Sequence, residues 1–145
     1  MDIGKSLNLA LIPAAGLIVL GLVQIGIGLI PAVGGVLSCL TGSVGLVIQI
    51  AIVGWAGYNA VKSGGLDMMG AALTGAIAAI VGGLVVGIIS IALVMLNIGA
   101  AGAAAGIGTG VGIAIILGAI AVGVVINAII GAVVGAVGGL IAARK

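Results

Sequence analysis

Apolar residues form very long runs in this chain, separated by few polar positions. No charged side chain occurs from residue 6 to 61 or from residue 68 to 143. Each run far exceeds the ~18 apolar residues that suggest a membrane span. The clearest break is the polar stretch at residues 62–67, and weaker breaks fall at Pro31 with the Gly34–Gly35 pair and at Asn97 with the glycines and alanines after it. The pattern predicts four apolar spans, at about residues 7–30, 44–61, 68–96 and 112–143.

All four spans are predicted to be helices. Inside a bilayer only helices and closed barrels satisfy their backbone groups, and the chain lacks the polar–apolar alternation of barrel strands. At ~1.5 Å per residue the third and fourth spans are each roughly 45 Å long. We therefore expect them to tilt, kink or project beyond the ~30 Å hydrocarbon core. Pro13 is expected near the start of the first helix, where its missing N–H costs least.

Composition supports a membrane protein and excludes a water-soluble domain. Apolar residues make up 64% of the 145 residues, charged residues only 4%, and the mean hydropathy is +1.67. A soluble domain carries about 25% charged residues. The predicted fold is thus a single all-α transmembrane domain over residues 1–145, with four helices packed through glycine and alanine faces. No cleavable signal is expected at the N-terminus, and the single cysteine, Cys39, cannot form a disulfide within the chain.

The few charges predict the orientation in the membrane. With four spans, Lys5, Lys62 and the Arg144–Lys145 pair fall on one side, whereas the connections at about residues 31–43 and 97–111 are uncharged. The positive-inside rule then places both termini in the cytoplasm. Trp55 and Tyr58, which shortly precede Lys62, are expected to anchor the second helix at the headgroup level; the alternative is that they are ordinary packing residues.

Small residues recur every fourth position in the third and fourth spans, and residues four apart share a helix face. Close backbone approach through such faces is a usual way for helices to associate in lipid. We predict two small-residue strips, with the partner of each left open between this chain and another copy, and with packing of the third span on the fourth favoured. The first strip is Ala71, Gly75, Ala79, Gly83 and Gly87; the second is Gly123, Asn127, Gly131, Gly135, Gly139 and Ala143.

Four polar side chains near or within the spans need explanation. Asn127 is expected to fix helix register through an interhelical hydrogen bond worth about 1 kcal/mol; the alternative is contact with a ligand or an ion. Gln24 and Gln49 invite the same two interpretations and could bond each other. Asp67 directly precedes the third span, and we expect it to be the helix N-cap, where a carboxylate accepts hydrogen bonds from free N–H groups.

No catalytic, cofactor-binding or metal-binding residues are predicted. The chain has no histidine, one cysteine and no pair of carboxylates that could share a site. The net charge of +2 is too small to indicate nucleic-acid binding. The sequence GIGTGVG at residues 106–112 resembles both the inner helix of rotary ATPase ring subunits and part of a potassium-channel filter. It lacks the ring's carboxylate and the filter's last two residues, so we expect a flexible or closely packed loop.

The stretch WAGYNAVKSGGLDMMGAALTGAIAAIVGGLVVGIIS at residues 55–90 resembles small, glycine-rich, four-span membrane proteins of archaea and some bacteria. The resemblance covers roughly residues 1–96 and implies the four-span topology, but no activity. A looser likeness is to the very hydrophobic coat proteins of spindle-shaped archaeal viruses, which share high hydrophobicity and few charges.

Two functions follow from these features. The first is a structural protein that contacts membrane lipid and self-associates, as a membrane scaffold, a lipid-associated coat protein or a small accessory subunit of a larger complex. The second is a passive channel, a holin-like pore or a minimal transporter that uses the amides as a weakly polar path. The first is favoured, because channels and transporters usually carry more polar lining. Enzymatic activity is not expected.

Overall fold

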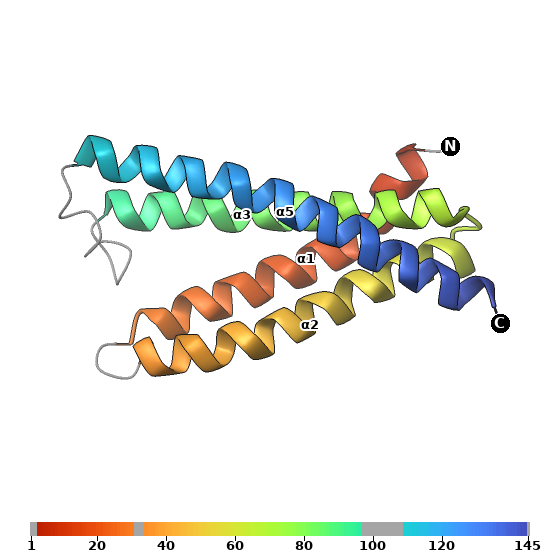
Figure 1. Ribbon diagram of the computed structural model, residues 1–145, viewed down its shortest axis with the longest axis horizontal. Helices are drawn as coiled ribbons and strands as arrows, with labels where there is room; N and C mark the ends of the chain where they lie inside the picture. The colour runs from red at the N-terminus through yellow and green to blue at the C-terminus, as the bar shows by residue number, and fades with distance from the viewer. Residues whose placement is uncertain (1–2, 31–33, 97–108, 145) are drawn as a thin grey trace.

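The computed structural model describes residues 3–30, 34–96 and 109–144. Figure 1 shows the helices that these parts of the chain form: α1 (Ile3–Gly28), α2 (Gly34–Lys62), α3 (Met68–Met95) and α5 (Thr109–Ala143). Each of the four contains a stretch long and apolar enough to cross a membrane, and the described residues contain no strand. The all-α fold with four membrane-spanning helices is therefore confirmed.

Several helix boundaries differ from those predicted. Since α1 begins at Ile3, Pro13 lies inside the helix, where it is buried, and not near its start. The helix α2 begins at Gly34, so the glycine pair belongs to the helix and does not interrupt the chain. Residues 109–112 are helical and not part of a loop, while residues 97–108 lie outside the described residues. These helices run through glycine and proline because a backbone without water must bond to itself.

The helices run alternately up and down, which brings residues 3 and 144 to one end of the bundle together with the α2–α3 turn (Figure 1). We call this the near end and the opposite one the far end. Both α1 and α5 pack against α2 and α3. In Figure 1 the α1–α2 pair diverges from the α3–α5 pair towards the far end. The core is built mainly from small side chains and is made by residues of α1, α2 and α3: Ala10, Ala14, Leu17, Val53 and Ala78.

The α2–α3 turn is short, and the backbone N–H groups of residues 63–66 are hydrogen-bonded. The N–H groups of Gly65 and Leu66 donate to the carbonyls of Val61 and Ala60, each at 3.0 Å. Gly65 has φ +60, a conformation that glycine adopts without a steric penalty. Asp67 then starts α3 as its N-cap, and its Oδ1 accepts a hydrogen bond from the Gly70 N–H at 2.8 Å. The carboxylate therefore lies at a helix terminus, where it bonds an N–H left free by the first turn.

Candidate functional site

The near-end half of α5 packs backbone to backbone against α3. A Cβ placed on Gly135 would lie 2.7 Å from the carbonyl oxygen of Ala71, and one on Gly131 would lie 2.7 Å from that of Gly75. On Gly75 it would overlap the Gly131 carbonyl oxygen. No real Cβ tolerates such contacts, so the helices approach this closely only because these residues are glycines.

A second glycine contact joins α5 to α2, and of its glycines only Gly135 belongs to a predicted strip. A Cβ on Gly138 would overlap the carbonyl oxygen of Gly54 and lie 3.1 Å from the Tyr58 backbone nitrogen. A Cβ on Gly57 would overlap the Gly135 carbonyl. The signal in the sequence is the three-residue spacing of Gly54 and Gly57, because residues three apart also share a helix face. The near-end half of α5 is thus inserted between α2 and α3.

The predicted strips are only partly at helix contacts. Gly139 contacts Ala71, Gly131 contacts Ala79, and Gly87 faces Ile120, whereas a Cβ on Gly83 would meet nothing closer than 3.9 Å. At the two ends of the α5 strip the described part of this chain supplies no close partner, since a Cβ on Gly123 has no atom within 4 Å and Ala143 is exposed. The reason is geometric: a four-residue step turns by about 40° beyond a full turn, which adds up to about 200° between these two residues.

The glycines with open surroundings cluster towards the far end. No atom lies within 4 Å of a Cβ placed on any of five helical glycines: Gly26, Gly28, Gly42, Gly118 and Gly123. All five lie in the far-end halves of α1, α2 or α5, where Figure 1 shows the two helix pairs diverging. The open glycines are therefore found at the far end, although other glycines there are covered: a Cβ on Gly45 would overlap Gln24, and one on Gly87 would lie 3.1 Å from Ile120.

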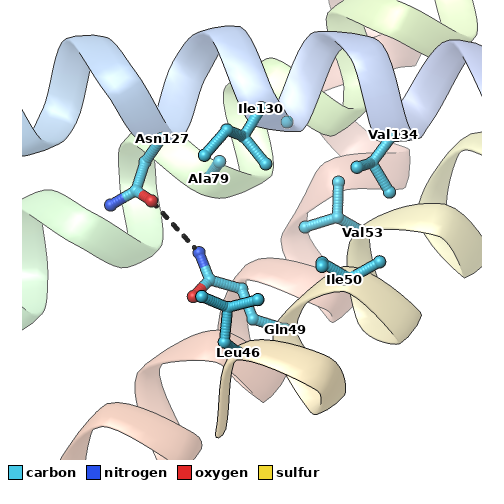
Figure 2. A pocket seen from close by; sticks show the side chains of 9 residues that line it. Leu46, Gln49, Ile50, Val53, Ala79, Asn127, Ile130 and Val134 are labelled. Carbon is cyan, nitrogen blue, oxygen red and sulfur yellow. Dashed lines mark hydrogen bonds between the residues drawn. The ribbon is translucent and has the colours of Figure 1, made fainter. Parts of the chain in front are cut away.

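Amide side chains meet between the helices, within the stretches long and apolar enough to cross a membrane. The Gln49 Nε2 group of α2 donates a hydrogen bond to Asn127 Oδ1 of α5 at 3.3 Å (Figure 2). Gln49 precedes Tyr58 by nine residues, about 14 Å along a helix and close to half of a ~30 Å hydrocarbon core. Asn127 thus bonds Gln49 across the α2–α5 contact, while the Gln24 amide nitrogen of α1 packs over Gly45, where a Cβ would overlap it.

Two cavities lie on either side of this hydrogen bond. One, of about 190 Å³, is lined by Gln24, Gln49 and Asn127 together with apolar residues of α1 and α3. The other, of about 100 Å³, is lined mainly by aliphatic residues of α2 and α5 (Figure 2). Gln49, Ala79 and Asn127 line both cavities. The Gln49–Asn127 pair therefore forms a boundary between a polar cavity and an apolar one.

The predicted interface anchors lie at the near end. Lys62 Nζ donates to the Tyr58 hydroxyl at 2.8 Å and lies 5.2 Å from the centre of its ring. The Trp55 side chain is 49% exposed, and Arg144 is exposed; Lys145 lies outside the described residues. The lysine–tyrosine pair joins a cation to an amphipathic ring, a combination suited to the headgroup level.

Among the described residues no group of three His, Cys, Asp or Glu side chains could hold a metal ion. The amide cluster offers neutral donors and acceptors, which bind and orient polar groups but supply no nucleophile or general base. No protein-family model matches the chain, and no curated protein and no solved structure is significantly similar to it. The fold and the apolar helices define the class, an integral membrane protein with four helices, and the resemblance noted for residues 55–90 stays a prediction.

Proposed function

We propose that this chain is a structural, self-associating component of a membrane, without catalytic activity. The observation that carries the proposal is the contrast between its two ends. At the near end glycines of α2, α3 and α5 contact one another within the chain, which supports packing of the glycine-zipper kind. At the far end five helical glycines, Gly118 and Gly123 of α5 among them, have open surroundings, and exposed aliphatic side chains such as Ile115, Leu117 and Val122 lie nearby on α5.

The close contacts at the near end stabilise the bundle, and the open glycines at the far end provide a surface for assembly. In lipid, close approach of backbones through glycine allows dispersion contacts between helices to accumulate. The open glycines on α5 allow a helix of a second copy, or of another subunit of a complex, to approach closely. Such a role fits a scaffold, a lipid-associated coat protein or an accessory subunit, in a cell membrane or a viral envelope. The positive charges near Lys62 and Arg144 favour an orientation with both termini inside.

Enlarging the open glycines of α5 should disrupt assembly without disturbing the fold. We expect the wild-type protein to form dimers or larger species in lipid nanodiscs, and the Gly118→Leu/Gly123→Leu variant to be monomeric. Native mass spectrometry of the released protein measures both, and circular dichroism verifies that helix content is unchanged. The matched control is Ala143→Leu, an exposed position at the near end of the same helix, which should still assemble. A wild-type protein that stays monomeric and co-purifies with nothing would refute the proposal.

The amide cluster supports one alternative, a passive channel or minimal transporter. Its specific observation is that Gln24, Gln49 and Asn127 line one cavity in the membrane interior. Under this alternative, liposomes containing the protein leak small polar solutes in proportion to the protein density, and the double variant Gln49→Leu/Asn127→Leu seals them. Tight liposomes at high protein density would exclude it and leave the structural proposal untouched.

A further inference from the structure

We infer that the cavity of about 190 Å³ between α1, α2, α3 and α5 is a binding site for a small, neutral solute that carries both hydrogen-bond donors and acceptors, such as a short polyol. This site goes beyond the structural role and does not depend on it. The inference rests on unsatisfied amide groups, on a lining of mixed polarity, on the available volume and on the absence of charge nearby.

The amide pair leaves one donor group and one acceptor group for a ligand. The single hydrogen bond between Gln49 and Asn127 uses Gln49 Nε2 and Asn127 Oδ1. The other atom of each amide, Asn127 Nδ2 and Gln49 Oε1, forms no hydrogen bond with any of the described residues. No buried side-chain nitrogen or oxygen in this part of the chain lacks a partner, so these two atoms face open space. A polar atom left unbonded away from water costs about 1–3 kcal/mol, which an occupant of the cavity removes.

The cavity lining has a polar part and an apolar part. Gln24, Gln49 and Asn127 supply amides, whereas Leu17, Leu20 and Val86 supply aliphatic surface. Water can form hydrogen bonds with the amides but makes no favourable contact with the aliphatic side chains. A hydrocarbon packs well against the aliphatic side chains but leaves the amides without hydrogen bonds. A molecule with hydroxyl groups on a short carbon chain matches both parts.

Volume and charge narrow the ligand class. A cavity of about 150 Å³ accepts benzene, which has six non-hydrogen atoms, so about 190 Å³ accommodates a molecule the size of glycerol. No charged residue lines the cavity. Desolvating an ion in the membrane interior costs at least about 3 kcal/mol, which three neutral amides do not offset well. The site is therefore selective for neutral molecules.

Gly83 provides a way to fill this cavity without disturbing helix packing. It lines the cavity from α3, and a Cβ placed there would meet only Asn127 Nδ2 and Val124 Cγ2, both at 3.9 Å. A leucine at this position has room at its base and extends its branched end into the space that the solute would occupy. Gly118→Leu is the matched control, because Gly118 has no neighbour within 4 Å and does not line the cavity.

The test uses side-chain amide NMR signals of the full chain in lipid nanodiscs, with glycerol as the probe. The chain contains only two glutamines and four asparagines, so single substitutions assign the signals of Gln24, Gln49 and Asn127. We expect saturable shifts of these signals with glycerol in the wild-type protein and in Gly118→Leu. In Gly83→Leu the apparent affinity should fall at least about tenfold, equivalent to 1.4 kcal/mol.

A second variant tests the inference independently, in case Gly83→Leu does not fold. In Gln49→Leu/Asn127→Leu the Gln24 signal should no longer respond to glycerol, while the dispersed backbone signals show that the fold persists. The inference is overturned if glycerol gives no saturable shift, if Gly83→Leu and Gly118→Leu respond alike, or if benzene binds and glycerol does not. Contact of the amides with water alone, with no response to glycerol, would also overturn it.

Discussion

Replacement of Gly138 by alanine is expected to lower the free energy of unfolding by about 3 kcal/mol, although it adds a single methyl group. The added carbon would overlap the Gly54 carbonyl oxygen and approach the Tyr58 backbone nitrogen. Both neighbours are backbone atoms, so neither can rotate away, and α5 must separate from α2. Reversible unfolding in mixed micelles, followed by far-UV circular dichroism, measures the loss.

Gly123→Ala in the same helix is the matched control. Its new methyl group meets no atom within 4 Å, and alanine is favoured over glycine in a helix by up to about 1 kcal/mol. We expect the stability of the monomer in dilute detergent to be unchanged or slightly raised. Equal effects of the two substitutions would show that α5 does not pack as described.

Substitution of Asn127 by aspartate should destabilise the protein by about 3 kcal/mol at neutral pH, because a charge at the centre of a membrane helix is costly. The two side chains have nearly the same shape, and a carboxylate oxygen can still accept the hydrogen bond from Gln49 Nε2. The loss therefore reports the charge and not the contact. Asn127→Leu, which removes only the hydrogen bond, should cost about 1 kcal/mol. The same unfolding assay compares them.

Ala143→Asp controls for the effect of a new acidic residue on α5. Ala143 is exposed and directly precedes Arg144. The carboxylate of the new aspartate therefore remains at the membrane surface, and the free energy of unfolding should change little. If Asn127→Asp proved as harmless as Ala143→Asp, Asn127 could not lie in the membrane interior, and the amide cavity would lose its basis.

The fold and much of the α3–α5 contact follow from local features of the sequence. Long uncharged runs define the spans, and small residues four apart identify the face that Gly75, Gly131 and Gly135 share. The cap at Asp67 is equally local, because it depends only on the residues of one turn. Features within a few helical turns are predictable because the helix geometry fixes which side chains are neighbours.

Contacts that depend on how whole helices rotate and cross were not predictable in this way. Gly123 belongs to the strip by spacing, yet it has left the interface because the strip winds around α5. The sequence offered Gln24 as one possible partner of Gln49, but the Gln49 side chain bonds Asn127, 78 residues away. Apolar periodicity cannot reveal such a pair, since every face of these helices is apolar.

The position of α5 between α2 and α3 has a consequence for the order in which the protein matures. The three helices that precede α5 in the chain are synthesised first and enter the bilayer as separately stable units. Until α5 follows, Gly54, Gly57 and Gly75 lack the α5 backbone that they approach in the complete bundle, whereas the core shared by α1, α2 and α3 needs no residue of α5. The close glycine contacts of α5 are thus the last to form, onto a core that the three earlier helices already share.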